Sequence, residues 1–256
     1  MSQISIFLYY NTYMSCILIL AGGLGKRMKS EIPKVLHKLN DISILSNIIQ
    51  KFLPLNRDIY IVVGKYEETI KTTLLNELGN LDNIKFCRQD KSLGTGHALQ
   101  SAIKNIKKYK GVVVINGDVP FIKQTTIENM LNSKNDSLLG VCDLEVMNKE
   151  WFGHGRIILD GNYLDRIVEE KDCNDEQRKI KIINGGLYYF KMKPLLELCD
   201  KLDNNNKQQE YYITDYISIF KTHGYNFLPI YLEKNEVLNI NTPEQLNIAK
   251  RILNNK

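Results

Sequence analysis

Short apolar segments alternate with longer segments of helical periodicity through the first half of the chain. The clearest is GVVVIN at 111–116, which is followed by Gly117 and Asp118. Continuous apolar runs of this length are typical of strands buried on both faces of a sheet. Strands are predicted at 15–20, 59–64, 84–89 and 111–116, and helices at 44–52, 66–78, 95–106 and 125–131. This alternation predicts βαβ units and an α/β fold with a parallel, doubly wound sheet.

The second half has a different pattern, with strands following one another directly. Strands are predicted at 138–145, 156–159, 164–170 and 183–191. With little helix between them, they favour an antiparallel or mixed extension of the sheet. Helices are predicted again at 193–201, 213–222 and 243–253. No repeat or linker divides the chain, so a single domain is expected over 14–256.

Composition excludes several classes of protein. The 256 residues are 43% hydrophobic and 25% charged, with a net charge of +5 that is spread along the chain. No basic stretch interleaves with aromatic residues, so a nucleic-acid groove is not expected. No apolar run approaches the roughly 18 residues of a membrane span. Five cysteines without a CxxC pair indicate reduced thiols in the cytoplasm.

Residues 1–13 are apolar and aromatic, but they have no basic n-region and no small-residue cleavage site. A signal peptide is therefore not expected. Two interpretations of this segment stay open: Met14 is the true start of the protein, or residues 1–13 form a poorly tied extension before the domain, which is predicted at 14–256.

A glycine-rich segment, LAGGLGKRMKSEIPKVL at 20–36, follows the first predicted strand. Glycines at the carboxyl end of a strand allow backbone N–H groups to approach phosphate oxygens. The segment matches neither GxxxxGK[ST] nor GxGxxG. It is distinguished by two cations, Arg27 and Lys34, with Pro33 before the second. Two cations beyond a glycine loop suit a triphosphate whose charge changes during a reaction.

This loop resembles the signature of the sugar-1-phosphate nucleotidyltransferases, and within them the bacterial-type UDP-N-acetylglucosamine pyrophosphorylases. The resemblance extends from Ile17 to about Arg251 and is carried by further motifs. These are KVLHKL at 34–39, LGTGHA at 93–98, NGDVPFI at 116–122, GHGRI at 153–157, IVEEKDCNDEQRKIKIINGG at 167–186 and EYYITD at 210–215. It implies a Rossmann-like mixed sheet with an antiparallel sugar-binding extension.

The resemblance also implies a role for individual residues. Arg27, Lys34 and Asp118 would be catalytic, and Asp118 and Asn241 would bind Mg²⁺. Gly155, Glu169 and Asn184 would contact the sugar, with Lys171 near its phosphate. The nucleotide would be bound by Leu20, Ala21, Gly22, Gly23, Gln89, Gly94, Thr95, Asn116 and Gly117. The amide of Gln89 offers both a donor and an acceptor, as the edge of uracil requires.

Other interpretations of these residues stay open at this point. Asp118 suits a turn, and Asn241 suits a cap for the helix predicted from Pro243. Gln89 suits a surface strand end, and Thr95 a helix N-cap. Glu169 could be a solvated residue of a strand, and Asn184 a strand residue whose side chain forms local hydrogen bonds. The segment EYYITD could pack in the core.

The chain also departs from the family pattern. Asn116 stands in place of an aromatic residue, Gly185 in place of threonine, and Asn239 in place of glycine. The first two bear on sugar selectivity more than on chemistry. The four histidines share no metal-binding spacing, and none is expected to be catalytic.

The expected reaction converts UTP and N-acetylglucosamine 1-phosphate into UDP-N-acetylglucosamine and pyrophosphate, with Mg²⁺ as cofactor. Within the enzyme class, dTTP or glucose 1-phosphate is the alternative substrate. A catalytically inactive nucleotide-sugar-binding regulator is the alternative from another class. No hexapeptide repeats follow, so a left-handed β-helix acetyltransferase domain is not expected. Neither a nucleic-acid nor a membrane partner is predicted, and the oligomeric state stays open.

Overall fold

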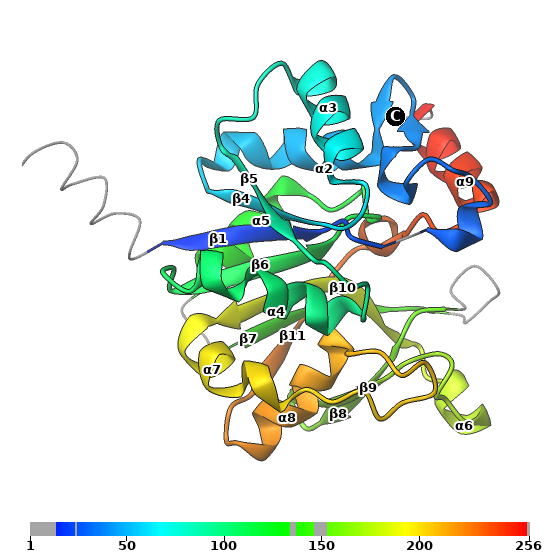
Figure 1. Cartoon of the computed structure of the whole chain (residues 1–256). Coiled ribbons are helices and arrows are strands. Elements are labelled where there is room, and N and C mark those ends of the chain that lie inside the picture. The colour runs from blue at the N-terminus through cyan, green and yellow to red at the C-terminus, as the bar shows by residue number, and fades with distance from the viewer. Residues whose placement is uncertain (1–13, 24, 134–136, 146–152, 255–256) are drawn as a thin grey trace, which may run out of the picture.

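The computed structural model describes residues 14–23, 25–133, 137–145 and 153–254. Within these residues, nine strands form one mixed sheet with helices on both faces, and β2 and β3 form a separate short hairpin (Figure 1). The predicted extension at 1–13 lies outside the described residues.

The central strands are parallel, as predicted. They are β1 (Ser15–Leu20), β4 (Ile59–Val63), β5 (Ile84–Arg88) and β6 (Gly111–Asn116). β1 lies between β4 and β6 and pairs in parallel with both. The sheet order is β11-β7-β10-β6-β1-β4-β5. Because β1 and β6 are neighbours, the segments that follow them meet at one edge of the sheet.

Alternate side chains of β1 enter two separate apolar layers. Ile17 and Ile19 pack in one core cluster, and Cys16 and Leu18 pack in the other. The first layer is covered by α2 (Ile44–Phe52), α3 (Glu67–Leu78), α5 (Gln124–Leu131) and α9 (Pro243–Asn254). The second is covered by α4 (Thr95–Ile106), α7 (Met192–Leu198) and α8 (Tyr216–Thr222). Burial on both faces explains the continuous apolar runs, and the doubly wound fold is confirmed.

The second half extends the sheet with antiparallel pairings, as predicted. These strands are β7 (Ser137–Asp143), β8 (Arg156–Asp160), β9 (Tyr163–Val168) and β10 (Ile182–Lys191). β10 pairs antiparallel with β6, β7 and β8, and β8 pairs with β9. Glu169 follows β9 in a turn, so its predicted place inside a strand is wrong. The short helix α6 (Asp175–Arg178) lies between β9 and β10.

One strand was absent from the sequence prediction. β11 (Phe227–Tyr231) pairs in parallel with β7 at the edge of the sheet. It is short and contains Pro229, which lacks an N–H and is tolerated in a sheet chiefly at edges. The apolar run FLPIYL at 227–232 is interrupted by this proline, which argues against a strand in the sequence.

The remaining elements are short. β2 (Lys38–Leu39) and β3 (Ile42–Ser43) form the hairpin. The 3₁₀ helices are η1 (Lys26–Met28), η2 (Lys34–Leu36), η3 (Leu53–Leu55), η5 (Cys199–Lys201), η6 (Ile213–Asp215) and η7 (Lys234–Val237).

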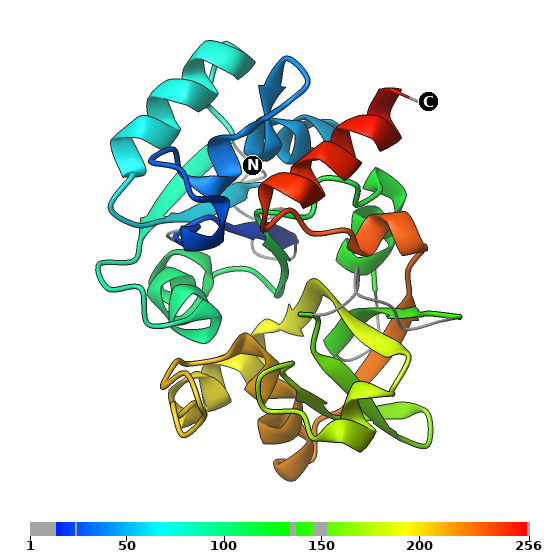
Figure 2. The ribbon, with the colours of Figure 1, turned by 90° about the vertical axis from the view of Figure 1, so that its right-hand side faces the viewer.

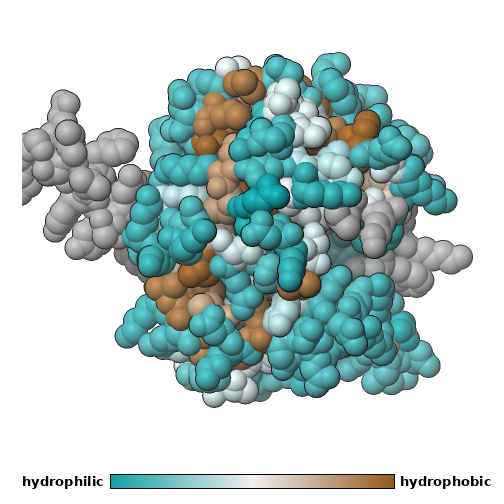
Figure 3. Space-filling model, viewed as in Figure 1, coloured by the Kyte–Doolittle hydropathy of each residue, from teal (hydrophilic) through white to brown (hydrophobic). Residues whose placement is uncertain are grey.

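The face seen in Figure 3 is mostly hydrophilic, and its apolar residues form separate patches. None of the helices in the described ranges is both long and apolar enough to cross a bilayer. All five cysteines are buried free thiols, as predicted.

Candidate active site

Two adjoining cavities open where β1 and β6 end. Figure 2 looks onto this edge of the sheet, with α9 above and the β8–β9 hairpin below. The larger cavity has a volume of about 430 Å³ and the smaller about 240 Å³. Four residues line both of them: Thr95, Asn116, Asp118 and Glu210. The two cavities therefore form one continuous site.

The residues predicted for the nucleotide all line the larger cavity. They are Leu20, Ala21, Gly22, Gly23, Gln89, Gly94, Thr95, Asn116 and Gly117. The N–H of Gly117 bonds the carbonyl of Leu20 at 3.0 Å, which joins the ends of β6 and β1. A Cβ at Gly117 would stand 2.8 Å from that carbonyl oxygen, so this close approach requires glycine.

The residues predicted for the sugar, Gly155, Glu169 and Asn184, line the smaller cavity together with Arg27 and Asn241. The residues predicted for the nucleotide thus line one cavity, and those predicted for the sugar line the neighbouring one.

Four polar side chains form a connected cluster at the boundary between the cavities. Nζ of Lys34 lies 2.5 Å from Oδ2 of Asp118 and 2.9 Å from Oδ1 of Asn241. The guanidinium of Arg27 donates to the same Asn241 oxygen at 2.9 Å. Two cations thus face one carboxylate and one amide, and all four residues were predicted to act together.

Local backbone geometry brings Lys34 to this place. Pro33 precedes the 3₁₀ helix that begins at Lys34, and its φ is −51°. Gly25 has a φ of +60°, and a Cβ there would stand 2.7 Å from Cβ of Lys34. A residue with a side chain at position 25 would be strained and would displace the lysine.

Asn241 reaches the cluster through a backbone bond. The N–H of Ile240 donates to the carbonyl of Asp118 at 2.8 Å. The hydroxyl of Thr242 accepts from the N–H of Gln245 at 3.3 Å, which is the capping contact of α9. Thr242, not Asn241, therefore caps this helix, and the side-chain amide oxygen Oδ1 of Asn241 accepts from the two cations.

The carboxylate of Asp118 fits a divalent cation. Asp118 is 8% exposed, and its Oδ1 is buried without a hydrogen-bond partner in the described structure. A buried carboxylate oxygen with no partner is costly unless a ligand satisfies it. Mg²⁺ takes oxygen ligands, commonly one or two carboxylates together with substrate phosphates. Asp118 and the amide oxygen of Asn241 form such a donor set.

Gln89 is not a surface strand-end residue, because it is 4% exposed. Its Nε2 lies 3.1 Å from the carbonyl oxygen of Gly94 and 3.1 Å from Nδ1 of His97. Gly94 has a φ of +114°, and a Cβ there would stand 2.4 Å from the carbonyl oxygen of Tyr211. Gly94 is therefore required by its conformation and by the close segment at Tyr211.

The sugar side of the site is held together by side-chain hydrogen bonds. Glu169 accepts from the hydroxyl of Thr214 at 2.9 Å, and burial raises the pKa of its carboxyl. The amide of Asn184 accepts from the N–H of Gly186 at 2.9 Å and donates to the hydroxyl of Tyr188 at 2.8 Å. Asn184 is thus locally bonded, as one alternative held, and also faces the cavity.

One departure from the family pattern, Gly185, has a packing explanation. The next residue, Gly186, is not a departure, but it has a φ of +71°, and a Cβ there would stand 2.7 Å from Nδ2 of Asn116. A Cβ at Gly185 would stand 2.8 Å from the carbonyl oxygen of Gly140 and 2.9 Å from Cδ1 of Leu232. In this chain the space of a threonine side chain at position 185 is taken by its neighbours.

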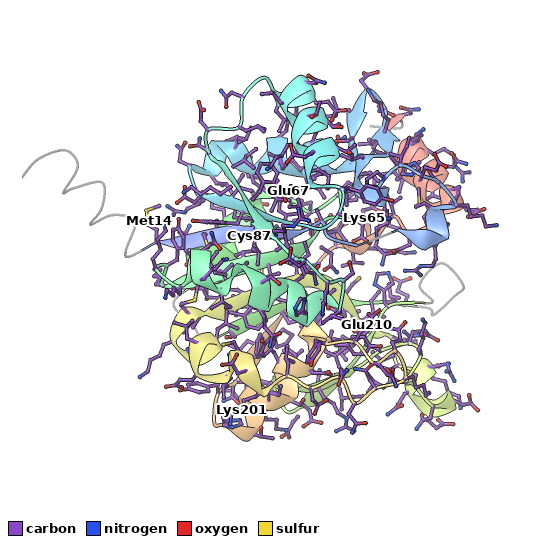
Figure 4. The ribbon with its side chains drawn as sticks, viewed as in Figure 1. Met14, Lys65, Glu67, Cys87, Lys201 and Glu210 are labelled. Atoms are coloured by element: carbon purple, nitrogen blue, oxygen red, sulfur yellow. The ribbon has the colours of Figure 1, made fainter. Side chains whose placement is uncertain are left out.

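The sequence prediction missed part of the lining. Glu210 (labelled in Figure 4), Tyr212 and Thr214 face the smaller cavity. They belong to EYYITD, for which core packing was an open alternative. Tyr212 is indeed buried, so it packs and lines the cavity at once. Lys171 bonds the side chain of Gln208 and is not among the lining residues of either cavity.

Comparison with known proteins agrees with this geometry. The profile described as a MobA-like NTP transferase domain matches residues 17–146, which is half of the chain. The chain belongs to the MobA-like NTP transferase family. A relative from Acanthamoeba polyphaga mimivirus, named "Probable UDP-N-acetylglucosamine pyrophosphorylase", is 36% identical over 245 residues that cover 92% of this NTP transferase and 95% of the viral protein.

Bacterial relatives are longer. "Bifunctional protein GlmU" of Clostridium botulinum is 38% identical over 243 residues, which cover 94% of this NTP transferase but 52% of GlmU. The chain thus spans about half the length of these relatives. The names of the relatives agree with the resemblance found from the sequence motifs.

Solved structures confirm the fold. A UDP-glucose pyrophosphorylase complexed with UDP-glucose matches with a TM-score of 0.72 at 18% identity, over 94% of this chain and 99% of that chain. HddC from Yersinia pseudotuberculosis, complexed with GMP-PN, matches with a TM-score of 0.66 at 20% identity, over 94% of this chain and 100% of the HddC chain. Identities this low show only that the fold is shared.

Proposed function

We propose that this NTP transferase makes UDP-N-acetylglucosamine and pyrophosphate from UTP and N-acetylglucosamine 1-phosphate. One observation carries the proposal. Two cavities, one lined by the glycine loop and one by the sugar-side residues, meet at a cluster of Arg27, Lys34, Asp118 and Asn241. The names of the relatives supply the substrates.

The larger cavity suits the nucleotide. The glycine loop from Leu20 to Gly23 offers backbone that can approach the triphosphate, and Gln89 offers its amide to the base. The smaller cavity suits the sugar phosphate, with the carboxyl of Glu169 as an acceptor for sugar hydroxyls. In this arrangement the phosphate of the sugar lies beside Asp118, where the cavities join.

The reaction is an in-line displacement at the α-phosphorus of UTP. A phosphate oxygen of the sugar phosphate forms the new P–O bond. The bond between the α-phosphorus and its bridging oxygen to the β-phosphate breaks, and pyrophosphate leaves with the electron pair. A phosphate is already ionised near neutral pH, so no side chain is needed as a base.

Arg27 and Lys34 act on the negative charge of this reaction. In the described structure they bond Asp118 and Asn241. Phosphate oxygens would compete for these two cations, which then stabilise the charge of the transition state and of the departing pyrophosphate. Asp118 and Asn241 would hold Mg²⁺, which supplies neutralisation of phosphate charge.

Five buried free thiols also support a reducing compartment, and we propose that the protein is cytoplasmic.

The test is a substrate panel with coupled detection of pyrophosphate. UTP, dTTP and CTP are each combined with N-acetylglucosamine 1-phosphate or glucose 1-phosphate, with and without Mg²⁺. We expect the highest kcat/KM for UTP with N-acetylglucosamine 1-phosphate, and no turnover without Mg²⁺. The variant Asp118→Asn should lose nearly all activity, whereas Asp82→Asn, at an exposed position, should not.

Each other outcome has a clear meaning. A preference for dTTP or for glucose 1-phosphate would overturn the proposed substrates while leaving the reaction class intact. Binding of UDP-N-acetylglucosamine without any turnover would favour the regulatory alternative.

A further inference from the structure

Gln89 is held by two hydrogen-bond acceptors on one side of its amide. These are the carbonyl oxygen of Gly94 and Nδ1 of His97, each 3.1 Å from Nε2. A carbonyl oxygen can only accept, so the Gly94 contact requires the amino group of Gln89 on this side. Nδ1 of His97 must then accept the second amide hydrogen, and it carries no proton in this arrangement.

The other side of the amide faces the glycine loop. A Cβ added at Gly22 would stand 2.6 Å from Oε1 of Gln89, and both residues line the larger cavity. No hydrogen bond to Oε1 occurs within the described residues, whereas both hydrogens of Nε2 are used. The sequence suggested that this amide offers a donor and an acceptor to a base. The structure leaves it only the acceptor.

An acceptor here distinguishes between pyrimidine bases. Uracil and thymine carry a hydrogen on N3, whereas N3 of cytosine is itself an acceptor. Where the base presents N3 to the amide, Oε1 can bond the N3–H of uracil and thymine, whereas at N3 of cytosine it would face another acceptor. A flipped amide would present Nε2 instead and would reverse this preference. Sites that leave a buried polar group unpaired discriminate strongly against the wrong ligand.

We propose that His97 is a positioning residue that sets the orientation of the Gln89 amide and so the preference of the site for uracil-type bases. The inference rests on the proposed function, because it assigns Gln89 to the base of the nucleotide. Gly94 and His97 act together on the amide, so loss of His97 weakens the orientation without removing it.

The backbone of His97 is fixed in a helix, and its ring lies beside an aromatic residue. His97 lies in the first turn of α4, and its backbone carbonyl accepts from the hydroxyl of Ser101 at 2.8 Å. Its ring lies 6.3 Å from the ring of Tyr211, at an angle of 40°. The backbone of Tyr211 packs against Gly94, so one segment supports both partners of the Gln89 amide. The His97 side chain is thus set on a helix, bonds the Gln89 amide and lies beside the ring of Tyr211.

Two variants of His97 separate its acceptor from its bulk. His97→Asn places an amide oxygen near the position of Nδ1, whereas His97→Phe keeps a ring and removes the acceptor. His223→Phe, at the end of α8, is the matched control. The kcat/KM values for UTP and for CTP are measured with N-acetylglucosamine 1-phosphate, and thermal unfolding is followed for each variant.

Loss of one hydrogen bond should lower the UTP-to-CTP ratio of His97→Phe about five- to tenfold. His97→Asn should stay within about threefold of the wild type, and His223→Phe should keep the wild-type ratio. If His97 had only a structural role, His97→Phe would lower kcat/KM for UTP and for CTP by the same factor. The UTP-to-CTP ratio would then stay unchanged. If His97→Phe does not fold, the smaller His97→Leu takes its place.

The two proposals fail separately. If the wild-type protein uses UTP and His97→Phe leaves the UTP-to-CTP ratio unchanged, the role of His97 is overturned and the proposed function stands. A wild-type protein that does not use UTP overturns the proposed function and the inference with it.

Discussion

Removing the ammonium group of Lys34 should harm both the reaction and the folded state. In Lys34→Met the Cβ that lies against Gly25 and most of the aliphatic stem are kept. The lost group is the one bonded to Asp118 at 2.5 Å and to Asn241 at 2.9 Å. Since Oδ1 of Asp118 already has no partner within the described residues, the variant leaves both oxygens of this buried carboxylate without one.

The magnitudes follow from these contacts. A buried acceptor that loses its partner costs about 1–3 kcal/mol, so the free energy of unfolding should fall by that amount in the absence of ligands. A cation aimed at the charge of a transition state contributes about 2.7–4 kcal/mol, so kcat should fall by about 10²–10³. The effect should appear more in kcat than in the KM for UTP, because the charge develops in the reaction.

Pyrophosphate release measures kcat and KM, and urea unfolding measures stability. Lys193→Met, at an exposed position of α7, is the matched control and should change neither. A kcat within about fivefold of the wild type would refute the assignment of Lys34 to the transition state. A rise in KM alone would mean that the lysine only holds the bound triphosphate.

Three further changes test separate parts of the site. Glu169→Gln keeps an acceptor for Thr214 but replaces one carboxyl oxygen by an amino group that cannot accept from a sugar hydroxyl. The KM for the sugar phosphate should therefore rise about tenfold while that for UTP stays unchanged; steady-state kinetics measures both. Gly186→Ala, at a φ of +71° and against Asn116, should lower the free energy of unfolding in urea by about 1–2 kcal/mol, and an unchanged value would contradict the strain argument. Burial, followed by the nearby charges of Glu169, Asp203 and Asp172, raises the pKa of Asp215 to about 6. Because the folded-state pKa lies above the unfolded one, the protonated carboxyl favours folding below about pH 4, and this contribution is lost as the pH rises through about 6. Asp215→Asn should therefore be more stable than the wild type by about 1 kcal/mol at pH 7, allowing for its partial exposure, with no difference near pH 4; urea unfolding across this range decides.

The sequence predicted the central sheet well because burial on both faces leaves a strong local signal. The run at 111–116 could hardly be anything but a buried strand, and Asp118 at its end was correctly placed at the sheet edge. β11 was missed because Pro229 interrupts its apolar run, and a proline argues against a strand except at a sheet edge. Glu169 was placed in a strand because the predicted strand was extended to residue 170, whereas β9 ends at Val168 and a turn follows.

Contacts across long separations could be predicted only by resemblance. Arg27 and Asn241 are 214 positions apart, and no local pattern relates them. Periodicity gave no reason to pair Glu169 with Thr214. The role proposed for His97 also depends on a side-chain contact, because only the structure shows that both hydrogens of the Gln89 amide are already used.

The central claim is that a phosphate oxygen of the sugar phosphate attacks the α-phosphorus of UTP in the cluster at Asp118. The most direct measurement supplies N-acetylglucosamine 1-phosphate labelled with ¹⁸O in its non-bridging phosphate oxygens and follows both products by mass spectrometry. The account predicts that all of the label appears in UDP-N-acetylglucosamine and none in pyrophosphate. Label in pyrophosphate, or release of pyrophosphate without formation of a labelled nucleotide sugar, would contradict it.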